Sequence, residues 1–511
     1  MLSVKKTFRT NPKSSTFFSQ NHSLMEKTYL PFDAFLNKMG KLITIISILL
    51  FWLTLYANAQ TPFDARPLIN NATKKDTIQS DNSTTKPKKH FGRAAFEFAL
   101  SELTPWTYDK FIAKQEYVDI SLSTVKHNLN PGSWEFDNDE FETNQFGHPY
   151  GGSLFFNSFR SNGYSFWQAA PAAAAGSYLW ETFAENQAPA PNDFINTTFG
   201  GIVLGEMTYR LSNRLISKKR TGFKRQASEV AAFIIDPMNG LSRIMDGKWG
   251  KISDNDDDDK LDSTNVSAEF DLGFRTFSTN NINTTNTSKS GLYGSVKLIY
   301  GSAEKDLKTP FSNIYINTEF GQDDSSKVNI LSVYGSLIGW DFSKADSQDQ
   351  ELLILSANYD YINNQAFFYG AESAKANLFS QYVVSKGVKI NTSFGLGPVL
   401  LAAVPDKYLF KGRNYDYTSG VSVIAGGGIS IDDKLFYSID YRGGELFTIS
   451  GNASHYFLHV VSSELRYALG DGFSLAAEPG YLVLKADYKE HEDVTKNYSY
   501  FRVSTRYSLK F

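Results

Sequence analysis

The sequence predicts a mainly β protein, a transmembrane antiparallel β-barrel of about twelve strands preceded by an α-helical domain. Three observations support this prediction: alternating apolar and polar residues from about residue 265 onward, a segment typical of a secretory signal peptide, and a C-terminal aromatic residue, Phe511. Residues 497–511 show the alternation clearly, because one parity is mostly apolar and the other holds Arg502, Ser504, Arg506, Ser508 and Lys510. Since successive side chains of a strand point to opposite faces, this strand has one apolar and one charged face.

The alternating runs are each about ten residues or slightly longer, which suits a tilted strand that crosses a membrane. They cover residues 266–274, 295–301, 313–320, 328–340, 352–361, 376–384, 388–397, 420–431, 434–442, 456–469, 473–486 and 497–511. Tight turns are expected at 385–387, 432–434 and 470–472, and longer polar loops at 280–290, 405–417 and 489–497. This alternation of short and long connections is typical of outer-membrane barrels. A soluble β-sandwich is the alternative, but strand length, signal peptide and terminal aromatic favour the barrel over it.

The N-terminal part contains one strongly apolar run, Leu42–Tyr56, preceded by Lys41 and followed by the small-residue pattern Ala57-Asn58-Ala59. This order predicts a secretory signal peptide within residues 1–59, cleaved before Gln60. Because signal peptides begin with a short charged segment, we expect translation to start at Met39; an uncleaved N-terminal anchor is the alternative. Residues 60–90 are polar and lack periodicity, so they are expected to form a disordered linker.

The composition excludes several classes of protein. The chain has no Cys, so disulfides, cysteine catalysis and thiolate metal sites are excluded. Its formal net charge of −3 argues against nucleic acid as a partner, since phosphate binding needs a basic surface. No sequence pattern indicates a cofactor or a metal.

Residues 91–250 are expected to form a helical domain that lies in the periplasm, on the membrane surface or inside the barrel as a plug. The first helix, beginning near Phe91, is expected to end before Pro105. Helices are also expected at 192–215 and 223–235, with small residues that allow close helix packing. Residues 251–264 contain an acidic run without the spacing of a calcium loop, and we expect an acidic linker there.

Strand parity predicts which charged residues face the lumen. They are Glu269, Asp271, Arg275, Asp440, Arg442, Glu464, Arg466, Arg502 and Arg506. First and last strands pair when a barrel closes, so acids of the first are expected to meet arginines of the last. Because both signs are mixed, a packed salt-bridge network is favoured over a selectivity lining.

A second polar set lies among apolar and small residues of the helical domain: His148, Glu181, Asp193, Asn196 and Glu206. One interpretation is a catalytic site with His148 as the base and carboxylates around it. The favoured interpretation is a set of helix caps and interhelical hydrogen bonds, because buried polar groups need partners. Neither an HExxH spacing nor a G-x-S-x-G motif is present, which argues against an enzyme without excluding one.

These residues belong to a longer series of short motifs, and the order of these motifs resembles that of a known family. The order is D-x-D-x-F-x-x-N-x-x-x-H-P-Y-G-G (137–152), R-S-N-G (160–163), W-E (180–181), N-D-x-I-N-T-T-x-G-G (192–201), L-G-E (204–206) and DPMNGLSR (236–243). It is similar to the domain-of-unknown-function 3943 family of Gram-negative outer-membrane and cell-envelope proteins. The resemblance implies a place in the cell envelope and implies no activity.

The sequence therefore predicts an outer-membrane barrel with a non-enzymatic channel, transport or structural role. The alternative is an envelope lipid-modifying enzyme whose polar site lies in the helical domain. Expected partners are outer-membrane lipids and the barrel-assembly machinery, which would recognise the last strand through Phe511.

Overall fold

The computed structural model describes residues 88–217, 220–251, 264–280, 287–302, 305–321, 328–344, 347–364 and 367–510, all within one compact unit. The predicted signal peptide, nearly all of the predicted linker, most of the acidic linker and Phe511 lie outside the described residues.

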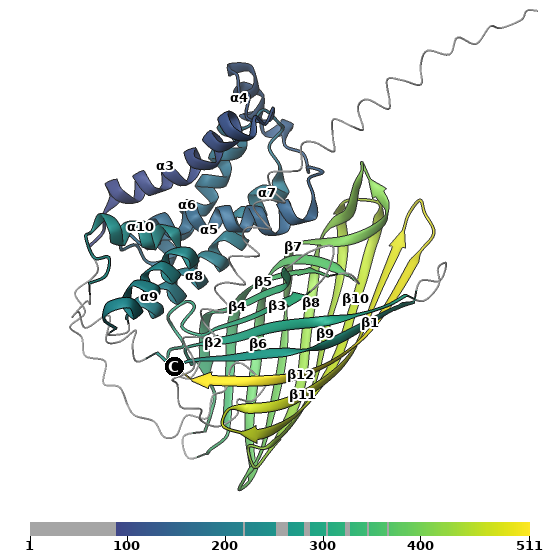
Figure 1. Cartoon of the computed structure of the whole chain (residues 1–511). Helices are drawn as coiled ribbons and strands as arrows, with labels where there is room; N and C mark the ends of the chain where they lie inside the picture. The colour runs from purple at the N-terminus through teal and green to yellow at the C-terminus, as the bar shows by residue number, and fades with distance from the viewer. Residues whose placement is uncertain are drawn as a thin grey trace, which may run out of the picture. The chain divides into compact units, whose positions relative to one another are not determined.

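In the described part of the chain, twelve antiparallel strands form a closed barrel in which each strand pairs with its neighbours in sequence and β1 pairs with β12 (Figure 1). This confirms the predicted antiparallel barrel of about twelve strands. The strands are β1 Val266–Asn280, β2 Thr287–Tyr300, β3 Ile314–Gly321, β4 Val328–Asp341, β5 Gln350–Asn363, β6 Phe368–Ser385, β7 Val388–Phe410, β8 Arg413–Ile431, β9 Leu435–Ser450, β10 Ala453–Gly470, β11 Phe473–Tyr488 and β12 Val494–Lys510.

One predicted loop is wrong. Residues 405–417 belong mainly to the ends of β7 and β8, which are joined by a turn at residues 411–412. Two of the charged residues that suggested a loop, Asp406 and Asp416, accept hydrogen bonds inside the barrel. Asp416 accepts hydrogen bonds from the Ala453 amide at 2.9 Å and the Tyr456 hydroxyl at 2.9 Å. The other two long loops are shorter than expected, because β2 begins at Thr287 and β12 at Val494.

The two faces of the barrel wall are identified by contacts across its interior. Lys297 of β2 and Glu464 of β10 lie 3.4 Å apart although their strands are not neighbours, so these side chains point inward. The opposite parity points outward. On β1 it carries Leu272, whose residue surface is 71% exposed, and Phe274.

The helices precede the barrel in sequence. They are α3 Phe91–Thr107, α4 Leu122–Asn128, α5 His148–Arg160, α6 Phe166–Leu179, α7 Pro191–Ile195, α8 Gly201–Ser217, α9 Gly222–Ile235 and α10 Pro237–Met245, with shorter turns η1 Tyr108–Ala113, η2 Pro131–Ser133, η3 Thr143–Gly147, η4 Trp180–Ala184 and η5 Asn196–Gly200. Among the described residues, none of these helices has the length and apolar character needed to cross a membrane. We call residues 91–251 the helical region.

The first helix continues past Pro105, contrary to prediction. The proline costs one backbone hydrogen bond. However, the buried face of α3 (Ala94, Glu97 and Ser101) lies on the side that packs against α5, and this tertiary contact outweighs the local preference.

The helical region packs against the outward face of the barrel wall. Helix α8 contacts β4 and β5, α7 contacts β7, and η5 contacts β6. Directly opposed residues share a face of a sheet. Such pairs connect the outward Phe270 of β1, through Val296, Thr318 and Leu331, to Tyr361 of β5. Tyr361 belongs to the apolar core that includes Phe141, Val203 and Met207 of the helical region.

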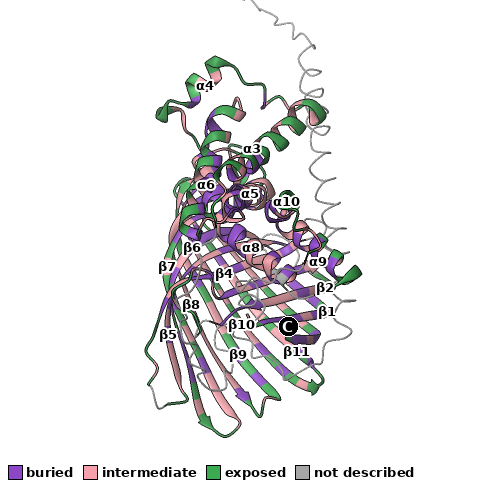
Figure 2. Ribbon diagram, turned by 90° about the vertical axis from the view of Figure 1, so that its left-hand side faces the viewer, coloured by how far each residue is buried: buried purple, intermediate pink, exposed green. Residues whose placement is uncertain are grey.

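Of the alternatives for the helices, the plug does not agree with these contacts, because the helices cover the outside of the wall rather than filling the lumen. Figure 2 shows buried residues on α5 and α8 above the strands, whereas α4 is mostly exposed. A second apolar cluster, with Leu446, Tyr456 and Leu484, lies inside the barrel.

Candidate functional site

The polar cluster of the helical region forms where two helical segments cross closely. Helix α5 meets η5 at Gly152, where an added Cβ would lie 1.8 Å from the carbonyl oxygen of Thr197. Gly201 is equally crowded, because its Cβ would lie 2.6 Å from the Cα of Gly152. Only glycine permits this approach, which brings the first residue of α5, His148, beside α7 and η5.

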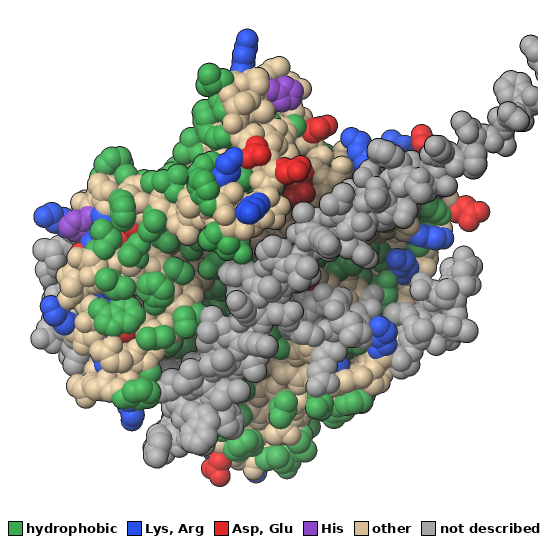
Figure 3. Space-filling model, turned by 45° about the horizontal axis from the view of Figure 1, so that its top comes forward, with side chains coloured by type: hydrophobic (Ala, Val, Ile, Leu, Met, Phe, Trp, Pro, Cys, Tyr) green, Lys and Arg blue, Asp and Glu red, His purple; other side chains and the backbone are tan. Residues whose placement is uncertain are grey.

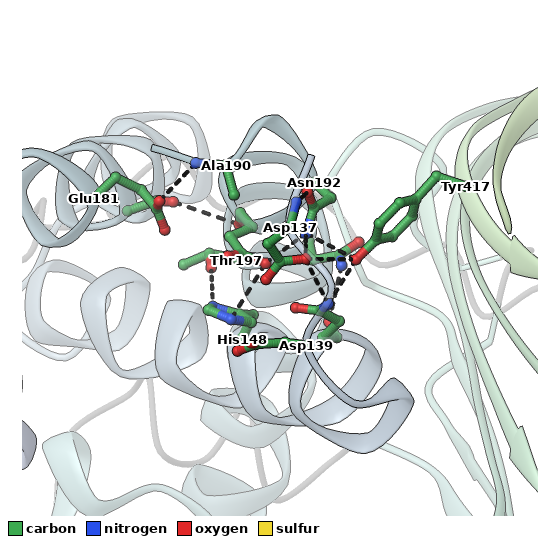
Figure 4. Close-up of polar contacts among 12 residues, drawn as sticks. Asp137, Asp139, His148, Glu181, Ala190, Asn192, Thr197 and Tyr417 are labelled. Carbon is green, nitrogen blue, oxygen red and sulfur yellow. Dashed lines mark hydrogen bonds and ion pairs between the residues drawn. The ribbon is translucent and has the colours of Figure 1, made fainter. Parts of the chain in front are cut away.

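His148 is held between two side chains of the facing segment (Figure 4). Its Nε2 lies 3.3 Å from Asp193 Oδ1, and its Nδ1 lies 3.3 Å from Thr197 Oγ1. The His148 side chain is 20% exposed and the Asp193 side chain 7%. One end of the ring is thus fixed by a carboxyl and the other by a hydroxyl.

Burial shifts both titrating groups of this pair toward their neutral forms. It lowers the pKa of His148, an effect partly opposed by the negative charge of Asp137. It raises the pKa of Asp193 well above its usual range, and the nearby carboxyls of Asp137 and Glu181 add to the shift.

Asp137 connects this cluster to the barrel. Its Oδ1 accepts hydrogen bonds from Asn144 Nδ2 at 2.9 Å, Asn192 Nδ2 at 2.8 Å and the Tyr417 hydroxyl at 3.2 Å. Arg413 of β8 donates to the Asp137 carbonyl oxygen at 2.6 Å. Because Tyr417 and Arg413 are barrel residues, the cluster spans the junction between the helices and the barrel wall.

The tyrosines of β8 extend the network. Asn144 Nδ2 donates to the hydroxyls of Tyr415 at 2.8 Å and Tyr417 at 2.6 Å, and the two hydroxyls lie 3.1 Å apart. Asn196, a predicted candidate, donates from Nδ2 to the Asn144 carbonyl oxygen at 2.8 Å. It thus supports the network without touching His148.

The other two candidates have different partners. Glu181 accepts a hydrogen bond from the Ala190 amide at 2.8 Å, and burial raises its pKa to about 7. Figure 4 shows it apart from the imidazole. Glu206 is fully buried and pairs with Arg160 at 2.7 Å and Arg210 at 2.8 Å, which ties α5 to α8.

Of the five candidates, the structure thus brings together His148 and Asp193 and adds Asn196 through Asn144. The sequence analysis did not select Asp137, Asn144, Thr197, Tyr415 and Tyr417 as site residues. The first three lie within the quoted motifs, which was the available signal. The tyrosines were assigned to a loop, and no local pattern indicates that β8 reaches the helices.

The charged residues of the barrel interior form an ion-pair network near the end where β1 begins. Asp271 lies opposite Arg506 in the β1–β12 register, as expected for a first and last strand that pair. Arg506 donates to Asp271 at 2.6 Å and to Glu464 at 2.8 Å, and Arg466 donates to Glu269 at 3.0 Å.

The remaining predicted lumen residues lie farther along the wall. Arg275 bonds Glu319 on β3, a residue that the sequence analysis missed, and Arg502 approaches the same carboxylate at 2.9 Å. Asp440 is half-buried and Arg442 is exposed on the inward parity of β9.

Exposure along β9 shows where the barrel interior is filled. Phe436 near one end is 4% exposed and Leu446 near the other is 1% exposed, while Arg442 between them is exposed. A side chain that faces an open lumen would be wetted, so both ends are packed. Between them, at the level of Arg442, the inward side chains of β9 are less buried.

The described residues contain no group of three or more His, Cys, Asp or Glu side chains placed to hold a metal ion. We call this polar network the junction cluster; it consists of Asp137, Asn144, His148, Asn192, Asp193, Asn196, Thr197, Tyr415 and Tyr417. The chemistry available to it is proton transfer by His148, with Asp193 and Thr197 orienting the ring.

Comparison with known proteins gives a family match for part of the chain. Residues 133–238 match the family described as Domain of unknown function (DUF3943), which confirms the predicted resemblance over the segment that holds the helical-region residues of the junction cluster. No curated protein matches the sequence.

The chain is also similar to solved outer-membrane proteins. An outer-membrane channel from Pseudomonas putida F1 has 10% identity, covers 48% of this chain and 95% of its own, and gives a TM-score of 0.30. The NanC porin has 8% identity, with 46% and 98% covered and a TM-score of 0.27. The channel DcaP of Acinetobacter baumannii has 10% identity, with 48% and 97% covered and a TM-score of 0.24. At these scores the likenesses carry no argument, and the barrel is established by its own strand pairing.

Proposed function

We propose that the protein is an outer-membrane β-barrel with a non-enzymatic transport or structural role in the cell envelope. The observation that carries this proposal is the apolar belt on the outward face, opposite an inward face rich in ion pairs. The belt consists of the exposed residues Leu272, Phe274, Leu292, Leu378, Phe394, Leu396, Val421, Ile439, Phe447, Val461, Leu465, Leu475, Phe501 and Val503. A closed barrel with such a belt satisfies its backbone groups internally and suits a bilayer.

The partners follow from this arrangement. Lipid acyl chains of the outer membrane contact the apolar belt, and the barrel-assembly machinery receives the last strand with its terminal Phe511. The protein reaches this membrane by export, with a signal peptide cleaved before Gln60.

The packed ends of the interior favour a closed barrel over a continuously open pore. A transport role then requires the ion pairs of Arg506 and Arg466 to rearrange, because they occupy the interior at one end. A structural role requires no such change. Conductance in planar bilayers separates the two roles: openings in the wild-type protein would support transport, and permanent silence would support a structural barrel.

The proposal is tested by heat-dependent gel mobility of the protein in isolated outer membranes. A folded barrel resists detergent and migrates differently before and after boiling, so a shift in the outer-membrane fraction is expected. Protein that stays soluble in the periplasm without a mobility shift would overturn the proposal, because the apolar belt would then have to cover a protein core.

A second candidate function is an envelope lipid-modifying enzyme, favoured by the fixed imidazole of His148 between Asp193 and Thr197. This arrangement orients a general base. If it acts on lipid, His148→Ala should leave the barrel folded and change envelope lipid composition. Unchanged lipids in a folded variant would exclude this function.

A further inference from the structure

The helical region has an unusual distribution of polar and apolar residues. In α3 the exposed residues are all uncharged: Phe91, Gly92, Phe96, Ala99, Leu100, Leu103, Thr104, Pro105 and Thr107. The charged residues of the same helix, Arg93, Glu97 and Glu102, are buried or half-buried. A helix on the surface of a water-soluble protein shows the reverse pattern, with charges outside and apolar residues inside.

The interior of the helical region holds its carboxylates in polar networks. Fully buried Glu97 accepts hydrogen bonds from Asn162 and Ser242, each at 2.7 Å. Buried Glu229 pairs with Arg225 at 2.8 Å and Arg243 at 2.7 Å. Ionisable groups that face the inside of a bundle and pair there are typical of helices in apolar surroundings.

The neighbouring helices also expose apolar side chains, although Lys224 of α9 is exposed as well. Helix α6 contains no charged residue, and its Trp167 is 63% exposed. Phe223 at the start of α9 is 83% exposed. Figure 3 shows hydrophobic side chains over much of the left-hand part of this face, where α3, α9 and α10 lie.

Charged residues mark both ends of the apolar face of α3. Exposed Lys88 and Lys89 precede the helix, and exposed Lys114 follows η1. Between them, Leu103 is 58% exposed and Phe111 65% exposed. Cationic side chains at the ends of an apolar stretch suit the headgroup zones that border a hydrocarbon layer.

We propose that the helical region is immersed in the same membrane as the barrel, with its apolar exterior in contact with lipid acyl chains. This inference rests on the proposed function, because it starts from a barrel wall that faces lipid. The helices cover the outward face of β4 to β8, so they occupy a place that lipid would otherwise take. Their own outer surface continues the apolar belt of the barrel.

Single-cysteine variants test the proposal cleanly, because the chain contains no Cys. A bimane fluorophore is attached at Leu103→Cys in α3, at Leu465→Cys in the apolar belt, and at Lys386→Cys in the tight turn between β6 and β7. Each full-length variant is reconstituted into phosphatidylcholine vesicles. Quenching is measured with doxyl groups on the lipid acyl chains and with aqueous iodide, and folding is checked by heat-dependent mobility.

The expected result is quenching of the Leu103 and Leu465 positions by the doxyl lipid, at least threefold stronger than at Lys386, which iodide quenches instead. Quenching of Leu465 by lipid but of Leu103 by iodide would overturn the inference and leave the proposed function standing. Iodide quenching of both would overturn the proposed function as well. Protection of Leu103 from both quenchers would mean that protein covers α3, and would overturn the inference. Phe111→Cys repeats the test if Leu103→Cys does not fold.

Discussion

Removing the guanidinium of Arg506 should destabilise the barrel strongly. This side chain is 1% exposed, and it donates to Asp271 at 2.6 Å and 3.1 Å and to Glu464 at 2.8 Å through two nitrogens. Its Nη1 also lies 3.3 Å from Glu269. In Arg506→Ala these carboxylates lose their shared counter-charge inside the barrel, although Glu269 keeps Arg466 and Glu464 keeps Lys297.

The magnitude follows from the energetics of buried ion pairs. Breaking one buried pair by removing a single partner costs about 3–5 kcal/mol, because the remaining charge is left uncompensated. Since Arg506 serves more than one carboxylate, we expect a loss at the upper end of about 3–5 kcal/mol in the free energy of unfolding. The assay is urea unfolding of the reconstituted barrel, followed by tryptophan fluorescence and heat-dependent mobility.

Arg442→Ala is the matched control. It removes the same kind of side chain from the same inward face, but Arg442 is exposed, so we expect a loss of about 1 kcal/mol or less. Neutralising two acids in the triple variant Arg506→Ala, Glu464→Gln, Asp271→Asn should restore part of the stability. Equal losses for Arg506→Ala and Arg442→Ala, or no rescue in the triple variant, would refute the claim that charge compensation closes this end.

Three further predictions concern the helical region. Gly152→Ala should prevent close packing of α5 on η5, because the added Cβ would clash with the backbone of Thr197. Gly151→Ala is the control, since its Cβ would meet nothing within 4 Å. Limited proteolysis should cleave the helical region faster in Gly152→Ala than in Gly151→Ala. Glu181→Gln should remove a pH dependence of the unfolding free energy. Burial raises the pKa of Glu181 from 4.5 to about 7, so the folded state binds this proton more tightly than the unfolded state does. The resulting stabilisation is complete below pH 4.5 and is lost as the pH rises toward 7. The difference in unfolding free energy between Glu181→Gln and wild type should change by up to about 3 kcal/mol between pH 4 and pH 8. A difference that stays the same across this range would contradict the raised pKa of Glu181. Tyr417→Phe should cost about 1 kcal/mol, because it removes the hydrogen bonds of a buried hydroxyl whose partners Asn144, Asn192 and Asp137 keep other hydrogen bonds. Tyr437→Phe, on the exposed wall, should cost almost nothing in the same unfolding assay.

The barrel was predictable because its signal is local. Strand periodicity appears within each run, and each run identified in the sequence overlaps a strand of the closed barrel. The loop error at 405–417 has the opposite cause. Asp406 and Asp416 are polar in sequence, but their partners, such as Tyr488 and Tyr456, lie on other strands and leave no local pattern.

The position of the helices was not predictable from alternation. The pattern establishes that Tyr361 and Tyr437 point outward, but Tyr361 is covered by helices and Tyr437 is exposed. Nothing in either strand distinguishes a lipid-facing tyrosine from one that meets a helix. The same limit applies to the site: motif spacing selected His148 and Asp193, whereas Tyr417 belongs to it only through the packing of β8.

The place of the helical region also decides what the junction cluster can act on. His148 contacts Asp193 and Thr197 inside the helical region, and the network beside it reaches Tyr417 on the outward face of the barrel through Asn192. If the exterior of α3 and α6 is in lipid, a molecule reaches this cluster from the membrane rather than from the lumen, because the barrel wall separates the two. The inward network of Arg506 and the junction cluster therefore lie on opposite faces of the wall, so a His148 variant that folds should leave conductance unchanged.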